Sequence, residues 1–96
     1  MPSDMFQPRG AQVIKSKAQG NGEYEAEFRV RGGNVHALAQ QAIKHAQSKG
    51  YRLVAREIDN DDADLKFRKG KRELNISIEQ KDHGIIEIDE DLDIEN

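Results

Sequence analysis

The nine residues "EYEAEFRVR", Glu23 to Arg31, alternate charged and apolar side chains without a break. Successive side chains of a β-strand point to opposite faces of the sheet, so this alternation predicts a strand with one buried and one solvated face. A weaker strand, "AQVIKSKAQ", precedes it across the turn "GNG" at residues 20–22. The two segments therefore predict a β-hairpin.

The next segment, "NVHALAQQAIKHAQSKG", predicts an amphipathic helix over about residues 34–49. Asn34 is a favourable N-cap, and Gly50 stands where a helix commonly ends. The apolar positions follow helical spacing and form one stripe: Val35, Leu38, Ala39, Ala42, Ile43 and Ala46. Half of the stripe is alanine, which lets the helix lie close against a sheet.

Four further strands are predicted at "YRLVAREI", "ADLKFR", "ELNISIE" and "GIIEID", joined by short turn-forming connectors. The expected fold class is α+β, a two-layer sandwich in β-β-α-β-β-β-β order with one helix on an antiparallel sheet of four to six strands. We expect a flexible N-terminal segment at 1–10, one α+β domain at 11–89 and an acidic C-terminal tail at 90–96. Apolar alternation continues beyond Ile88 with Glu90 as its exception, so the last strand is either long or followed by a solvated acidic tail.

The 96 residues suffice for one domain, and no apolar run approaches the roughly 18 residues that cross a bilayer. The chain has no cysteine, which excludes disulfides, thiolate nucleophiles and cysteine-based zinc sites. Residues 1–57 carry 9 basic and 5 acidic side chains, whereas residues 58–96 carry 6 and 13. This asymmetry favours pairing between the two halves, or with a second copy of the chain, over broad nucleic-acid binding.

The segment "RGGN", Arg31 to Asn34, joins the clearest strand to the helix. A helix N-terminus can hold an anion, and the nearby Arg29 and Arg31 support that interpretation. The segment lacks the spacing of phosphate-binding loops. In the alternative interpretation, Gly32 and Gly33 only reverse the chain and Asn34 caps the helix.

Basic residues suggest a second candidate contact, a positive strip on the sheet face away from the helix. Its expected members are Arg29, Arg31, Arg52, Arg56, Lys66 and the hairpin tip Arg68, Lys69, Lys71 and Arg72. Such a strip could meet nucleic acid, anionic lipid or an acidic protein. The alternative is a solvated mixed-charge face, and the aromatic residues occupy predicted core positions where they cannot stack on bases.

We find no catalytic, cofactor or metal site in the sequence. His36 and His45 stand nine residues apart on the predicted helix, so they cannot bind one metal together. The acidic run "DNDDAD", Asp59 to Asp64, lacks the central glycine and the final glutamate of an EF-hand loop. The expectation is a protein that is not an enzyme.

The segments "QPRGAQVIKS", "HAQSKGYRLV" and "LKFRKGKRELNISIE" together are similar to a pattern in small bacterial envelope domains, often lipoproteins, of unassigned function. The resemblance covers about Pro8 to Glu87, although Arg9 interrupts its Pro-Gly-Ala start and the lipoprotein cysteine is missing. It implies the periplasm rather than the cytoplasm. The element order also looks like cystatin-type domains, but their Gln-x-Val-x-Gly loop is missing.

These observations predict a small binding or assembly module that uses a mixed-charge sheet face and the acidic tail toward a protein partner or a second copy. A nucleic-acid-associated module using the basic strip is one alternative. A binder of small anions at the Gly32–Gly33 corner is another.

Overall fold

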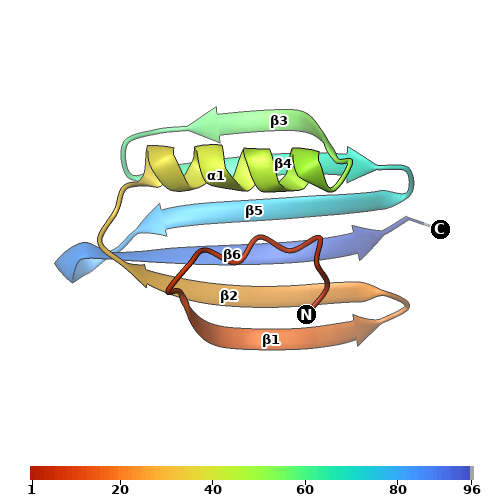
Figure 1. The fold of residues 1–96 in the computed structure, drawn as a ribbon, viewed down its shortest axis with the longest axis horizontal. Helices are drawn as coiled ribbons and strands as arrows, with labels where there is room; N and C mark the ends of the chain where they lie inside the picture. The colour runs from red at the N-terminus through yellow and green to blue at the C-terminus, as the bar shows by residue number, and fades with distance from the viewer. Residues whose placement is uncertain (96) are drawn as a thin grey trace.

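The computed structural model describes residues 1–95, in which every predicted strand and the predicted helix is present (Figure 1). The elements are β1 (Gln12–Gly20), β2 (Glu23–Arg31), α1 (Val35–Ser48), β3 (Arg52–Ile58), β4 (Asp62–Lys69), β5 (Arg72–Gln80) and β6 (Ile85–Ile94), with a short 3-10 turn at Asp82–Gly84 before β6. The α+β prediction of one helix on an antiparallel sheet is confirmed, and the sheet has six strands.

The strands lie in the order β1-β2-β6-β5-β4-β3, and every neighbouring pair is antiparallel. The last strand therefore inserts between the first hairpin and the meander β3–β5. Its register pairs Ile88 with Phe28 on one side and with Ile78 on the other. Because all three side chains are fully buried, the register matches apolar positions on the same face.

The helix α1 covers one half of one sheet face. Its predicted apolar stripe is buried, and it contacts β3, β4 and β5. The side chain of Asn34 accepts a 2.7 Å hydrogen bond from the amide of Ala37, as expected for an N-cap. Phe67, Leu74 and Ile76 pack beneath the helix as part of the core.

The N-terminal segment covers the other half of the same face. Figure 1 shows it running beside α1 over β6 and β2. The lack of periodicity predicts a flexible lead-in, but Asp4, Met5, Phe6 and Pro8 are buried in the structure. An irregular backbone leaves no repeating pattern in the sequence, although its side chains complete the core. We call Met1–Gly10 the N-terminal strap.

The acidic C-terminal residues belong to the sheet as far as Ile94. Of the two alternatives for this segment, the structure has the single long strand, because β6 runs from Ile85 to Ile94. Residues 90–94 of the expected tail thus form part of a central strand, whereas Asn96 lies outside the described residues.

Candidate functional site: the open face of the sheet

The sheet face opposite α1 and the strap has no second layer over it within residues 1–95, and we call it the open face. Residues that alternate with the buried core positions point to it. Its centre is β6, which contributes Glu87, Asp89, Asp91 and Asp93. The register places further carboxylates on the flanking strands: Glu25 and Glu27 on β2, Glu73 and Glu79 on β5, and Asp62 and Asp64 on β4.

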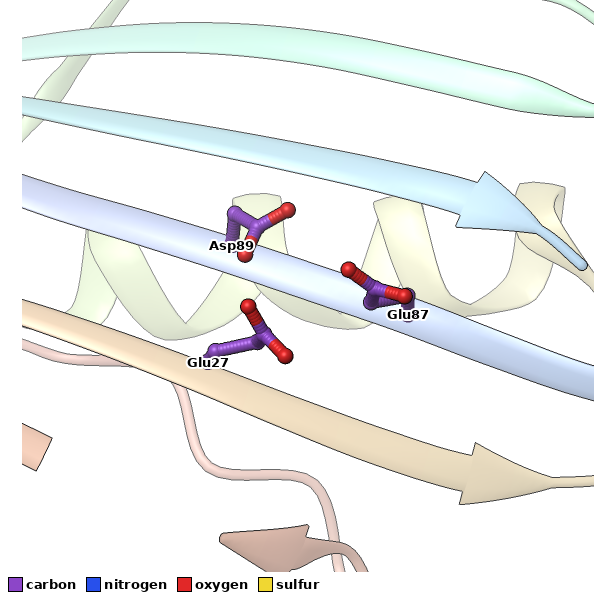
Figure 2. Close-up of side chains that lie close together, drawn as sticks. All are labelled: Glu27, Glu87 and Asp89. Carbon is purple, nitrogen blue, oxygen red and sulfur yellow. The ribbon is translucent and has the colours of Figure 1, made fainter. Parts of the chain in front are cut away.

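Three of these carboxylates lie particularly close together. One carboxylate oxygen from each of Glu27, Glu87 and Asp89 lies within 4.8 Å of the other two. Figure 2 shows the three side chains close together on β2 and β6. Burial raises the pKa of Asp89 to about 6, and its hydrogen bond and repulsion with Glu27 add to this effect. The arrangement stabilises either a shared proton or a nearby cation.

Few cations of the chain compensate this charge. The ion pairs of the open face are Lys15 with Glu25 at 2.5 Å, Lys81 with Glu79 at 3.0 Å and Arg68 with Glu73 at 3.4 Å. Over the described part of the chain, Glu27, Glu87, Asp89, Asp91 and Asp93 form no ion pair. Burial, followed by repulsion from Glu25 and Asp93, also raises the pKa of Asp91.

A trough of about 310 Å³ crosses the open face from β3 to β6. Small or short side chains, Ala55, Asn75 and Ser77, give it depth. Asp89 and Asp91 line its β6 side, and its other lining residues are Arg56, Glu57, Asp64, Leu65, Lys66 and Ile76. The trough thus changes from mixed charge at β3 and β4 to negative charge at β6.

The predicted basic residues do not form one strip. Arg29 and Arg31 lie on β2, whereas Arg52 and Arg56 lie on β3 and Lys66 and Arg68 on β4. Strand β5 and strand β6, whose residues Glu87, Asp89, Asp91 and Asp93 form an acidic column, separate the two groups.

The hairpin tip is largely engaged within the protein itself. Lys69 donates to the carbonyl of Lys49 at 2.8 Å and stacks near Tyr51, while Arg72 pairs with Asp4 at 2.9 Å. Arg68 also pairs with Glu95, and Lys71 is exposed at the turn.

The Gly32–Gly33 corner is a chain reversal with φ of +75° and +80°, values that favour glycine. The amide of Gly32 donates to the carbonyl of Gly84 at 2.8 Å. Arg29 and Arg31 pair with Glu87 and Ile85 in the sheet register, so they point to the open face, where they line a separate hollow of about 240 Å³. The structure therefore does not bring these arginines together with the N-terminus of α1.

Sequence reasoning missed the polar contacts beneath the strap. Tyr51 donates a 2.5 Å hydrogen bond to Asp4, which Arg72 also contacts. Burial acts to raise the pKa of Asp4, but the hydrogen bonds from Tyr51 and Arg72 hold it below its usual value. The fully buried Glu90 accepts a hydrogen bond from the amide of Phe6. The sequence gives one indication that Glu90 is buried: it occupies a position where the alternation of β6 otherwise has an apolar residue.

Comparisons of the chain with models of known protein families, with curated proteins and with solved structures found no match. Within the part of the chain that the structure describes, α1 is too short and too polar to cross a membrane, and no other helix qualifies.

Proposed function

We propose that this protein is a small non-enzymatic binding module whose open face holds a lysine- and arginine-rich segment of another protein. The observation that carries the proposal is the acidic column along β6, Glu87, Asp89, Asp91 and Asp93. Within residues 1–95 these four carboxylates form no ion pair, and they lie at the centre of a sheet face without a second layer. Burial is the main reason why the pKa values of Asp89 and Asp91 are raised, and repulsion from neighbouring carboxylates adds to it; a cationic segment laid on this column would relieve that repulsion.

The partner's chemistry follows from the charge pattern. The carboxylates of β6 would repel phosphate groups from the centre of the open face, and the arginines next to this strand on that face, Arg29 and Arg31, lie opposite Glu87 and Ile85 near one end of β6. A basic side chain has the opposite charge, and its apolar stem can pass over Ala55 and the short side chains of the trough. Electrostatic complementarity of this kind raises association rates and selects among partners.

The proposal is tested by fluorescence anisotropy of a labelled peptide of lysine, arginine and serine, titrated with the whole chain at several salt concentrations. The expected result is binding that weakens as salt rises. The double variant Asp89→Asn/Asp91→Asn is expected to weaken it by roughly tenfold, as the loss of charge pairs worth ~1.4 kcal/mol predicts.

The matched control is Asp59→Asn/Asp61→Asn, which removes the same charge from the exposed connector between β3 and β4. It is expected to change the affinity much less. Equal losses in both double variants would mean that net charge alone attracts the peptide, and the proposal would fail. Tighter binding of a nucleic-acid duplex than of the peptide would replace it with the alternative of a nucleic-acid-associated module.

Location in the bacterial envelope, which the sequence resemblance implies, is part of the same proposal. It predicts that the native protein fractionates with periplasmic or membrane-associated material. Recovery in the cytoplasmic fraction would argue against it.

A further inference from the structure

The N-terminal strap differs from every other covering element of the fold. It forms neither a strand of the sheet nor a helix, yet it covers the half of the core that α1 leaves open. Met5 and Phe6 are 3% and 6% exposed, and they pack in the same cluster as Ala26, Phe28 and Ile88. Its attachment therefore rests on a few side chains and hydrogen bonds.

One of these hydrogen bonds is accepted by an ionisable group, Glu90, which forms no ion pair with any residue that the structure describes. The amide of Phe6 donates to Oε1 of Glu90 at 2.8 Å. The other carboxyl oxygen, Oε2, is buried and has no hydrogen-bond partner among the described residues. The cross-strand neighbours of Glu90 are Ala26 and Ile76, each 1% exposed.

We propose that the strap is a detachable cover that stays in place while Glu90 is uncharged and is released when Glu90 ionises, with α1 and the sheet remaining folded. A buried carboxylate without a counter-ion is strongly unfavourable, whereas the protonated acid needs only a hydrogen-bond partner. Burial raises the pKa of Glu90 to about 8, although the Phe6 amide acts in the opposite direction.

Four other titratable groups border this half of the core. They are Asp4 on the strap, His45 on α1, Tyr51 after α1 and Arg72 on β5. Burial and the contact with Asp4 raise the pKa of Tyr51 to about 12, and Arg72 stays cationic, so neither changes charge near pH 8. Nε2 of His45 lies 3.0 Å from the carbonyl oxygen of Ser3, and an imidazole with a proton on Nε2 donates this hydrogen bond without carrying a charge.

Release of the strap exposes an apolar groove. Departure of Met5 and Phe6 uncovers Phe28 and Ile88, beside the flank of α1. Water can then reach the Glu90 carboxylate without unfolding of the sheet, because no strand pairing involves the strap. This inference concerns the face opposite the proposed binding surface, and it does not depend on that proposal.

The test uses the two methionines of the chain, Met1 and Met5. In the whole protein carrying carbon-13 methionine methyl groups, the Met5 signal reports the strap, and exposed Met1 serves as an internal reference. The methyl groups of Ile43 on α1 and Ile78 on β5 report the rest of the core. Spectra are recorded on both sides of about pH 8.

The expected result is that Met5 moves toward the position of an exposed methionine as the pH rises, while Ile43 and Ile78 keep their folded positions. The ratio of released to attached strap should rise by up to tenfold per pH unit, as linkage to one proton requires. In the Glu90→Gln variant, whose amide oxygen can still accept from Phe6, Met5 should stay buried over the same range. In Asp4→Asn, which weakens a second attachment, release should begin at lower pH.

Three results would overturn the proposal. In the first, the Met5 signal is unchanged in the wild-type protein. In the second, it moves equally in Glu90→Gln, which would assign the effect to a group other than Glu90. In the third, Ile43 and Ile78 lose their folded positions together with Met5, which would mean global unfolding instead of release.

Discussion

The amide of Phe6 donates a hydrogen bond to the side chain of Glu90 across 84 positions of the chain. It joins the irregular N-terminal strap to β6, the strand that links the first hairpin to the meander. Because the acceptor is a buried acid, the stability of the protein depends on pH at this contact.

Glu90→Gln is expected to flatten the pH dependence of folding. The pKa of Glu90 rises from 4.5 to about 8 in the folded protein, so the native state binds more protons than the unfolded state between these values. The wild-type free energy of unfolding should therefore be highest on the acidic side of this window and fall as pH rises, by at most ~1.4 kcal/mol per pH unit. Urea unfolding at a series of pH values measures both slopes, and parallel curves for the two proteins would contradict the assignment.

Tyr51→Phe is expected to destabilise the protein by about 1–2 kcal/mol, because a buried carboxylate loses a hydrogen-bond donor. Tyr24→Phe is the matched control. Its hydroxyl contacts Ser16 on the exposed part of β1 and β2, so its removal should cost less than about 0.5 kcal/mol. Urea midpoints of the two variants measure the difference. Equal effects would show that the Asp4 contact adds no stability.

Ending the chain after Asp89 is expected to prevent folding, because it removes Glu90 to Ile94 from a strand paired on both sides. Ending it after Ile94 removes only Glu95 and Asn96 and should change stability by roughly 0.5 kcal/mol or less, since an exposed ion pair is lost. Circular dichroism and thermal unfolding distinguish the two. A cooperative transition in the shorter chain would mean that the end of β6 is dispensable.

Asp89→Asn is expected to stabilise the protein slightly near neutral pH, by a few tenths of a kcal/mol. Partial burial of the carboxylate and repulsion from Glu27 and Glu87 disfavour the charged form of Asp89, and solvent screens this effect because the residue as a whole is exposed. Its pKa is raised from 3.8 to about 6, so the wild-type penalty grows as pH rises through that window, and the gain from the variant should vanish at its acidic end. Asp82→Asn, in the 3-10 turn, is the control. Thermal unfolding of both variants and the wild type at the acidic and the neutral end of this window measures the effect. An equal gain in stability from Asp89→Asn at both pH values would contradict the prediction.

Much of the fold was predictable because its elements obey simple periods. Alternation over Glu23–Arg31 and helical spacing over Val35–Ala46 each define one buried face, and the structure has both. The candidate site was less predictable. The sequence indicated a charged sheet face, but the acidic column at its centre depends on β6 lying between β2 and β5. The sequence also predicted one positive strip, but the strand order places Arg29 and Arg31 on β2 and separates them by β6 and β5 from the basic residues of β3 and β4.

The sequence by itself determined which residues face the core within β2, β4 and β5 and along the helix, because side-chain direction follows from backbone geometry over a few residues. Only the tertiary structure decided which strands are neighbours, that the N-terminal strap closes the core, and that Glu90 lies buried beneath Phe6. These relationships join residues far apart in the chain, and their free energy comes from contacts that local periodicity does not encode.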